Sequence, residues 1–295
     1  MKHVLIAGAT GYLGRHLCAE YQRRGWHVTA LVRRKTGGAD LAADSIIEAE
    51  ATWPASLHGT MANIDLVVSA LGITRQADGV GYWDVDYQAN VNLLEEALRS
   101  NVLHFAFVHV LHADRMDHVP LVAAKAAFVR KLQTAGIQST IIAPTGYFSD
   151  MGDFFTMAKA GRVWLFGKGQ SRINPIDGAD LATATFDAVG RGAAWADIGG
   201  PKTFTQDEVA ALCFKALDQP QHITHLPDVL RRLSLWLLPR LAPRRIAGPA
   251  QFFLTAAAMN MTAPPHGTRQ LADHFQSLAA SSDAASAQNT KGDTP

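Results

Sequence analysis

One stretch decides the fold of this chain: Lys2-His3-Val4-Leu5-Ile6-Ala7-Gly8-Ala9-Thr10-Gly11-Tyr12-Leu13-Gly14-Arg15. An apolar, strand-like run passes into three spaced glycines, and a helix-like run follows over residues 15–24. Such a turn directs the first amides of the helix at a pyrophosphate. Gly8 permits the turn, Gly11 lets the backbone approach the phosphates, and Gly14 lets helix and strand pack closely. Because the glycines lie between a strand and a helix, the pattern predicts a dinucleotide site.

The residues after the second predicted strand indicate which dinucleotide fits. That strand covers residues 27–32, and Arg33, Arg34 and Lys35 follow it. An NAD-selective site usually has Asp or Glu there, against the ribose hydroxyls. Guanidinium groups suit a 2′-phosphate instead, and Arg15 is placed to join them. We therefore expect NADP(H) rather than NAD(H). Ordinary solvated loop charges are the alternative interpretation.

Composition is that of an ordinary globular protein. The 295 residues are 48% hydrophobic and 18% charged, with a formal net charge of +1. No broad basic field suggests a nucleic-acid partner. Cys18 and Cys213 are too few for a disulfide framework, so we expect small buried thiols. No signal peptide precedes the first strand, and a reducing, cytoplasmic location is the expectation.

Strand-like and helix-like runs alternate as far as a predicted strand over residues 139–143, which predicts an α/β fold with a doubly wound parallel sheet of the Rossmann type. Further strands are predicted over residues 45–49, 64–72, 105–111 and 139–143, and helices over residues 87–100 and 121–135. Ala70, Leu71 and Gly72 end the fourth strand. They lie at the carboxyl edge, where adenine and its ribose would rest.

The alternation stops at residue 147. Residues 147–175, rich in aromatics and glycines, are predicted as a substrate-side loop insertion in the NAD(P)-binding domain of residues 1–200. Asp177 and Thr205 are predicted to cap the helices that follow them. Residues 201–278 are predicted as a smaller, mostly helical, substrate-side region. The tail, residues 279–295, lacks bulky apolar residues and is predicted to be disordered.

Residues 233–245 combine a leucine-rich apolar face with three arginines. The segment is too short and too interrupted by proline to span a bilayer. Bulky apolar residues beside arginines are typical of a membrane-surface helix, so peripheral membrane contact is one interpretation. A helix packed over the substrate side of the core is the favoured alternative, because leucine and aromatic stripes are usually buried.

Five segments together resemble the atypical, extended short-chain dehydrogenase/reductases. They are Gly8-Ala9-Thr10-Gly11-Tyr12-Leu13-Gly14, Leu31-Val32-Arg33-Arg34, residues 86–97, Pro144-Thr145-Gly146-Tyr147-Phe148 and residues 174–181. Within that superfamily the chain looks NmrA-like, with divinyl-chlorophyllide-reductase-like and isoflavone-reductase-like relatives nearby. The resemblance covers roughly residues 2–278. The motifs and the resemblance give these predicted cofactor contacts: Gly8, Thr10, Gly11, Tyr12, Leu13, Gly14, Arg15, Arg33, Arg34, Ala70, Leu71, Gly72, Lys125, Pro144 and Tyr147.

The chain departs from this superfamily at the usual catalytic positions. A standard member has a Tyr four residues before a Lys; the phenolate transfers the proton, while the ammonium lowers the Tyr pKa and holds the nicotinamide ribose. Here Lys125 takes the Lys position and Leu121 the Tyr position, and His109 takes the place of the usual Ser. The resemblance implies that Lys125 still binds ribose. The isoflavone-reductase-like group adds proton transfer by a lone Lys.

His109 and Tyr147 are the candidates for the missing acid, beside Lys125. An imidazole titrates near neutral pH, and Tyr147 follows the sixth strand at the same edge of the sheet. A structural role is the alternative for each. The spacing of His109, His112 and His118 matches no metal-ligand pattern, so no metal site is predicted.

Two function classes remain open. The first, slightly favoured, is an NADP(H)-dependent reductase acting on a small organic substrate with an activated C=C bond, an imine or a carbonyl. The second is a catalytically silent NADP(H)-binding redox sensor or assembly and scaffold protein. A small-molecule substrate, no nucleic acid, and a monomer or homodimer are the expected partners and state.

Overall fold

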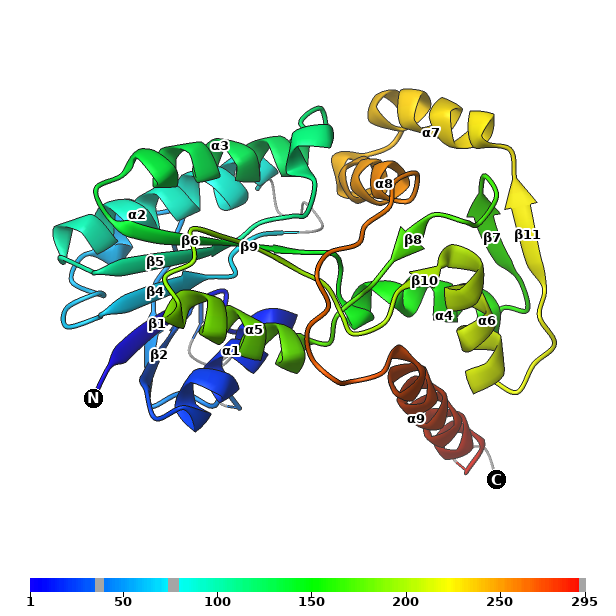
Figure 1. Ribbon diagram of the computed structural model, residues 1–295, viewed down its shortest axis with the longest axis horizontal. Helices are drawn as coiled ribbons and strands as arrows, with labels where there is room; N and C mark the ends of the chain where they lie inside the picture. The colour runs from blue at the N-terminus through cyan, green and yellow to red at the C-terminus, as the bar shows by residue number, and fades with distance from the viewer. Residues whose placement is uncertain (35–39, 74–79, 292–295) are drawn as a thin grey trace.

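The computed structural model describes residues 1–34, 40–73 and 80–291, with side chains described through residue 282. Lys35, part of the predicted basic group, lies outside the described residues. Seven parallel strands form the central sheet in the order β3-β2-β1-β4-β5-β6-β9 (Figure 1). The strands are β1 (His3–Ala7), β2 (His27–Val32), β3 (Ser45–Glu48), β4 (Leu66–Ser69), β5 (His104–Val108), β6 (Gln138–Pro144) and β9 (Trp195–Ile198).

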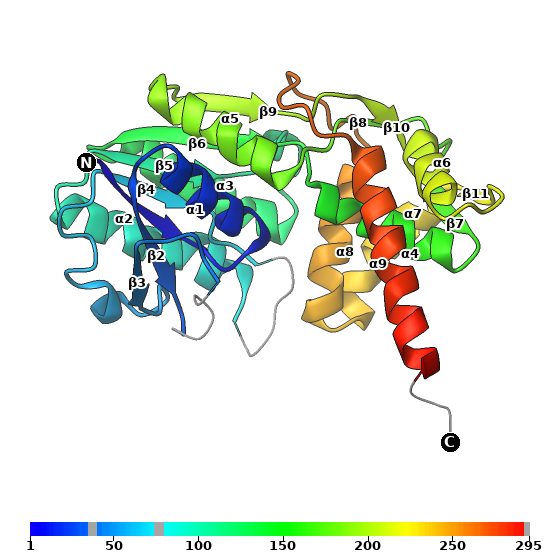
Figure 2. The same cartoon turned by 90° about the horizontal axis from the view of Figure 1, so that it is seen from below.

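Helices cover both faces of the sheet, which confirms the predicted fold class (Figures 1 and 2). Helices α1 (Tyr12–Arg23) and α5 (Gly178–Gly190) lie on one face, and α2 (Asn90–Arg99) and α3 (Pro120–Thr134) on the other. Both faces are therefore buried, as in other parallel sheets.

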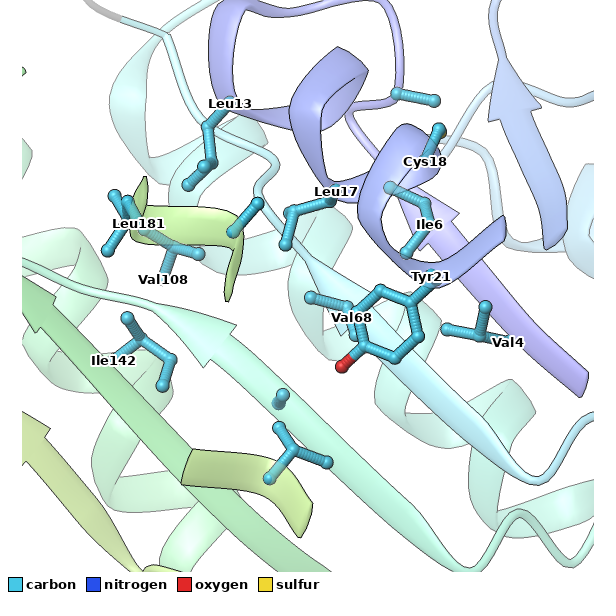
Figure 3. Packing of buried hydrophobic residues seen from close by; sticks show 14 of the residues in the cluster. Val4, Ile6, Leu13, Leu17, Cys18, Tyr21, Val68, Val108, Ile142 and Leu181 are labelled. Carbon is cyan, nitrogen blue, oxygen red and sulfur yellow. The ribbon is translucent and has the colours of Figure 1, made fainter. Parts of the chain in front are cut away.

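Alternate residues of β1 enter two separate cores. Val4 and Ile6 join the core beneath α1 and α5, whereas Leu5 and Ala7 join the core beneath α2 and α3. Figure 3 shows the first core, where Tyr21 of α1 projects toward the sheet. The period of two along a strand produces this division.

The sheet order reverses direction between β1 and β4. The chain moves outward through β2 and β3, then returns to pair β4 with the other edge of β1. The carboxyl ends of β1 and β4 thus border a topological switch point, where open α/β sheets bind their ligands.

A second region lies beyond the carboxyl ends of the strands (Figures 1 and 2). Its core contains Phe148, Phe155, Phe214 and Phe275. Its elements are α4 (Gly152–Lys159), α6 (Gln206–Ala216), α7 (Asp228–Leu241), α8 (Arg244–Ala256), α9 (Leu271–Lys291) and two small sheets, which pair β7 (Val163–Phe166) with β11 (Ile223–Leu226) and β8 (Arg172–Ile173) with β10 (Phe204–Thr205).

Several sequence predictions need correction here. Residues 147–175 are not an irregular loop, because they contain α4, β7 and β8 and share the second core with residues after 200. Their aromatics, read as pocket lining, are partly core: Phe155 is 6% exposed. The seventh strand, β9, was not predicted. Its Trp195, Ala196 and Asp197 carry no period-two apolar pattern that marks a half-buried strand.

The predicted disordered tail is helical as far as Lys291. Alanine-rich sequence favours a helix, and Phe275 and Ala279 anchor its first part in the second core. Two predicted caps are confirmed. Asp177 accepts a hydrogen bond from the amide of Ala179 at 2.9 Å, and Thr205 caps α6.

Both cysteines are free, buried thiols, one in each region. Cys18 lies in the core beneath α1 and α5, and Cys213 lies in the core of the second region. Burial raises the pKa of each thiol to about 12. None of the described helices has the length and hydropathy needed to cross a membrane.

Candidate functional site

The glycine turn after β1 is built so that side chains would not fit. Gly8 has a φ of +79°, and a Cβ there would lie 2.9 Å from the carbonyl carbon of Ala70. A Cβ on Gly14 would lie 2.1 Å from the carbonyl oxygen of Gly8. The amide of Gly11 donates to that same oxygen at 3.0 Å and closes the turn. The turn therefore holds β1, β4 and the start of α1 in close backbone contact.

The first turn of α1 is an open anion site. No side chain caps this helix at Gly11, and its first turn contains no acidic residue. The amides of Tyr12, Leu13 and Gly14 have no acceptor within the helix, because the first N–H groups of any α-helix lack one. These amides and the helix dipole suit a pyrophosphate, so the residues present fit a dinucleotide.

Aromatic contacts fix the start of α1. The phenol oxygen of Tyr12 accepts a hydrogen bond from the amide of Gly178 at 3.0 Å, which ties α1 to α5. The rings of Tyr12 and Tyr147 lie 5.7 Å apart, measured between centroids. Burial raises the pKa of both phenols. Both Tyr12 and Tyr147 are therefore neutral near pH 7.

Two described residues of the predicted basic group, Arg33 and Arg34, lie at the carboxyl end of β2, on the same edge of the sheet as the glycine turn, and are called the rim arginines below. Arg33 and Arg34 directly follow Val32 and are exposed. Arg15 is also exposed, and its Nε donates to the carbonyl of Thr10 at 3.3 Å. These guanidinium groups are available to solvent rather than packed in a core.

Lys125 forms a buried ion pair with Asp86. Its Nζ lies 3.3 Å from Oδ1 of Asp86 and donates to the carbonyl of Val108 at 3.1 Å. The Asp86 side chain is 0% exposed, and the Lys125 side chain is 12% exposed. Burial raises the pKa of Asp86, against the opposing effect of the Lys125 ammonium.

The backbone holds this pair in place. Asp86 lies in the π-helical segment Trp83–Ala89, and such segments are frequent at functional sites. Asn90 donates to the carbonyl of Asp86 at 3.1 Å and accepts from the hydroxyl of Ser69 at 2.6 Å. A Cβ on Gly72 would lie 2.6 Å from Asp86 Oδ1 and 2.9 Å from Lys125 Nζ. Gly72, a predicted cofactor contact, therefore covers the pair with backbone alone.

Sequence reasoning missed the role of Asp86. The residue begins one of the segments that carry the family resemblance, but the predicted helix starts one residue later, at Tyr87. A π-helical turn contains an extra residue, which changes the side chains that share a face. The 3.6-residue repeat of an α-helix therefore does not identify Asp86 as the partner of Lys125.

His109 lies at the end of β5, beside the ion pair. It is 4% exposed, and its Nδ1 has no hydrogen-bond partner among the described residues. Burial, reinforced by the charge of Lys125, lowers the pKa of His109 to about 3. The imidazole is therefore neutral near pH 7. Its orphaned nitrogen is free to bond a bound ligand or water.

Asp150 is a second acid that sequence reasoning missed. Its Oδ2 accepts a hydrogen bond from the amide of Tyr147 at 2.9 Å. Burial raises the pKa of this carboxyl to about 6. A carboxyl with such a pKa holds its proton at mildly acidic pH, which suits acid–base chemistry.

These groups share one large cavity between the sheet edge and the second region. Its volume is about 810 Å³. The three predicted catalytic residues, Lys125, His109 and Tyr147, all line it, as do Asp86, Asp150 and Leu121. Of the predicted cofactor contacts, it includes Gly11, Tyr12, Leu13, Gly14, Ala70, Gly72, Lys125, Pro144 and Tyr147.

Other predicted contacts lie outside this cavity: Gly8, Thr10, Arg15, Arg33, Arg34 and Leu71. The far wall is apolar and comes from the second region: Phe154, Met157, Trp164, Phe166, Phe252, Phe253, Met259 and Met261. Polar side chains of the second region also line the cavity: Asp153, Arg172 and Gln206. A mostly apolar chamber with a few polar groups is typical of a small-molecule site. The described residues contain no group of three or more His, Cys, Asp or Glu that could hold a metal ion.

Comparisons with known proteins agree with this geometry. A sequence profile described as NAD(P)H-binding matches residues 8–189, more than half of the chain. The chain is 28% identical over 265 residues to the divinyl chlorophyllide a 8-vinyl-reductase of Zea mays, covering 81% of this chain and 65% of the maize protein. It is 26% identical over 236 residues to the photosystem II assembly factor Ycf39 of Guillardia theta, covering 76% and 73%.

A solved structure has the same fold. The NADPH-dependent quinone oxidoreductase QOR2 of Escherichia coli, complexed with NADPH, superposes with a TM-score of 0.73 at 18% identity, over 93% of this chain and 99% of that one. The chain spans 65% of the length of the maize reductase, slightly under two thirds. The profile match, the strand order and the glycine turn lead to one conclusion. The chain belongs to the NAD(P)H-binding, atypical short-chain dehydrogenase/reductase family.

Proposed function

We propose that this protein is an NADP(H)-dependent reductase of a large, apolar organic substrate. The observation that carries the proposal is the Lys125–Asp86 ion pair, which lines a mostly apolar cavity of about 810 Å³ together with the open dinucleotide turn. The cavity would hold part of the cofactor as well as the substrate, and its mostly apolar far wall suits a conjugated organic molecule.

This chain offers contacts to each part of the cofactor. The amides of Tyr12, Leu13 and Gly14 bind the pyrophosphate, and the rim arginines Arg33 and Arg34 bind a 2′-phosphate. Lys125 binds the nicotinamide ribose, as the family resemblance implies. When bound, the reduced nicotinamide supplies a hydride.

The proton arrangement favours an acceptor that needs little acid. Leu121 replaces the usual Tyr, and the neutral His109 is a poor acid. The Lys125 ammonium, held by Asp86, is a charged donor that lines the cavity. An activated C=C bond or an imine suits this set better than a simple ketone, whose reduction creates an alkoxide.

Anaerobic NADPH oxidation against enones, quinones and imines tests the proposal. Lys125→Met should lower turnover at least a hundredfold, consistent with the usual contribution of a positioned proton donor. Lys131→Met is the matched control, since Lys131 lies on the same helix and pairs at the surface with Glu95. No substrate-dependent oxidation, or equal rates in both variants, would reject the assignment.

A second candidate function is cofactor-dependent binding without turnover, as in a redox sensor or an assembly factor. The observation that favours it is Leu121, which is 6% exposed and lines the cavity where the usual acid would be. Ycf39, one of the relatives, is an assembly factor. Tight NADPH binding with no turnover on any substrate class would support this function over the first.

A further inference from the structure

Helix α7 presents apolar side chains to the outside of the molecule. None of its residues is buried. Val229, Leu233, Trp236 and Leu241 are between 48% and 77% exposed. The first three recur at helical spacing, so they share one face. A surface helix normally turns its apolar face inward, so this exposed face is a candidate interaction site.

The segment formed by α7 and α8 is rich in arginine. Residues 228–256 contain five arginines and one aspartate, whereas the whole chain has a net charge of only +1. The aspartate, Asp228, is paired with Arg231 at 2.6 Å. The other four arginines are exposed: Arg232, Arg240, Arg244 and Arg245.

Arginine and tryptophan lie together on this face. The guanidinium carbon of Arg240 lies 4.7 Å from the centre of the Trp236 ring. Arg244 and Arg245 follow at the start of α8, after the extended residues Ala242 and Pro243, and precede the exposed Ile246. Bulky apolar groups bordered by cations are the signature of an element that lies in a membrane interface.

Helix α8 separates this surface from the cavity. Helix α7 packs on α8, and α8 packs on α3 of the sheet region. Figure 1 shows α7 as the outermost layer above α8. From α8, Phe252 and Phe253 line the cavity. A molecule bound against α7 therefore lies one helix away from the chamber.

We propose that α7 and the first turn of α8 dock this protein on an anionic lipid bilayer. The charge of this face favours an anionic bilayer over a second copy of the chain. A second copy would place the same arginines opposite one another across a two-fold axis, which like-charge repulsion disfavours. An anionic bilayer offers both an apolar layer for Trp236 and Leu233 and phosphates for the arginines. Docking also places the cavity one helix away from the lipid surface.

Vesicle co-sedimentation of the full chain, without cofactor or substrate, tests the proposal independently of catalysis. We expect binding to vesicles of phosphatidylcholine mixed with phosphatidylglycerol, weak binding to phosphatidylcholine alone, and a decline with added salt. Replacing Arg240, Arg244 and Arg245 by Gln should weaken binding about fivefold per arginine. Trp236→Ser should weaken it at least tenfold, because the ring buries a large apolar area in the interface.

Matched controls separate docking from general loss of charge or apolar area. Trp53→Ser removes an equally exposed tryptophan elsewhere, 64% against 57%. Arg130→Gln removes an exposed arginine from α3. Neither should change vesicle binding. Because the Trp236 and arginine side chains that are replaced are exposed, these variants should keep the wild-type circular dichroism and melting temperature.

Three outcomes would overturn the proposal. One is equal binding to both vesicle types, and another is absence of binding to either. The third is wild-type binding by the Trp236 and arginine variants. Sedimentation equilibrium completes the test, since a dimer that Trp236→Ser dissociates would assign the face to a second copy. Recovery of an acidic protein on this face, with no vesicle binding, would assign it to that partner.

Discussion

The cofactor end and the reaction end of this site are built in different ways. The cofactor end is formed by the backbone, through glycines without side chains and helix amides without acceptors. The reaction end is formed by the side chains of Lys125, Asp86 and His109, whose Nδ1 has no partner among the described residues. A backbone device is written in consecutive residues, whereas a side-chain group assembles from distant ones. The cofactor end can therefore be recognised from one short stretch of sequence, whereas the reaction end cannot.

The largest expected effect comes from filling the backbone device. Gly14→Val places a Cβ 2.1 Å from the carbonyl oxygen of Gly8, so α1 must move away from β1. We expect a loss of about 2–4 kcal/mol in the free energy of unfolding and no measurable NADPH binding. Chemical denaturation and fluorescence titration measure the two effects.

Gly136→Ala is the control for this change. A Cβ on Gly136 would meet nothing within 4 Å. Its stability should stay within about 0.5 kcal/mol of wild type, as for most surface substitutions. If Gly14→Val binds NADPH normally, the backbone description of the cofactor end is wrong.

The second prediction breaks the ion pair at the reaction end. Lys125→Met leaves the Asp86 carboxylate buried without its cation, and we expect a loss of about 2–3 kcal/mol near pH 7. The pKa of Asp86 is already raised by burial, and it should rise further in the variant. A raised carboxyl pKa favours the folded state at low pH, so the deficit should shrink as pH falls.

A double-mutant cycle tests the coupling directly. Asp86→Leu in the Lys125→Met background removes the stranded charge and should recover much of the lost stability. Denaturation of the four proteins at two pH values gives the coupling free energy. Strictly additive losses would mean that the 3.3 Å contact contributes nothing.

The third prediction concerns the rim of the cofactor end. Arg33→Gln and Arg34→Gln should each weaken NADPH binding about tenfold, or about 1.4 kcal/mol, and leave NADH binding unchanged. Competitive titration with the two cofactors measures this. Arg130→Gln, an exposed arginine on α3, is the control. If the variants lose equal affinity for NADPH and NADH, the two arginines do not bind the 2′-phosphate.

Near pH 7 the smallest effect on stability is expected at Asp150. Burial raises the pKa of this carboxyl to about 6, so between about pH 4 and pH 6 the folded state holds a proton that the unfolded chain releases. Wild-type stability should therefore fall, relative to Asp150→Asn, by about 2 kcal/mol as pH rises from about 4 to about 6. Melting temperatures across this window measure the difference. Asp117→Asn, which changes a carboxyl that is 82% exposed, is the control and should follow wild type.

The same contrast explains what the sequence predicted. The glycine turn, the parallel strands and the caps at Asp177 and Thr205 follow from local rules, because each depends on neighbouring residues. Asp86 escaped notice because its partner Lys125 is far along the chain, and Asp150 because its raised pKa depends on burial. The part of α9 after residue 278 was missed for a related reason: Phe275 and Ala279 anchor the helix in a core assembled from α4, α6 and β7.

Each region contains one buried cysteine, and the rate at which that thiol is alkylated reports how often the surrounding core opens. With thiol pKa values of about 12 and no exposed sulfur, neither Cys18 nor Cys213 should react with an alkylating reagent until the surrounding core opens. The alkylation rate of Cys18 measures the opening of the cofactor end, and that of Cys213 measures the opening of the substrate end. Without any engineered probe, the order in which the two thiols are labelled reveals which end of the site loosens first. The effect of added NADPH on each rate reveals which end the cofactor closes.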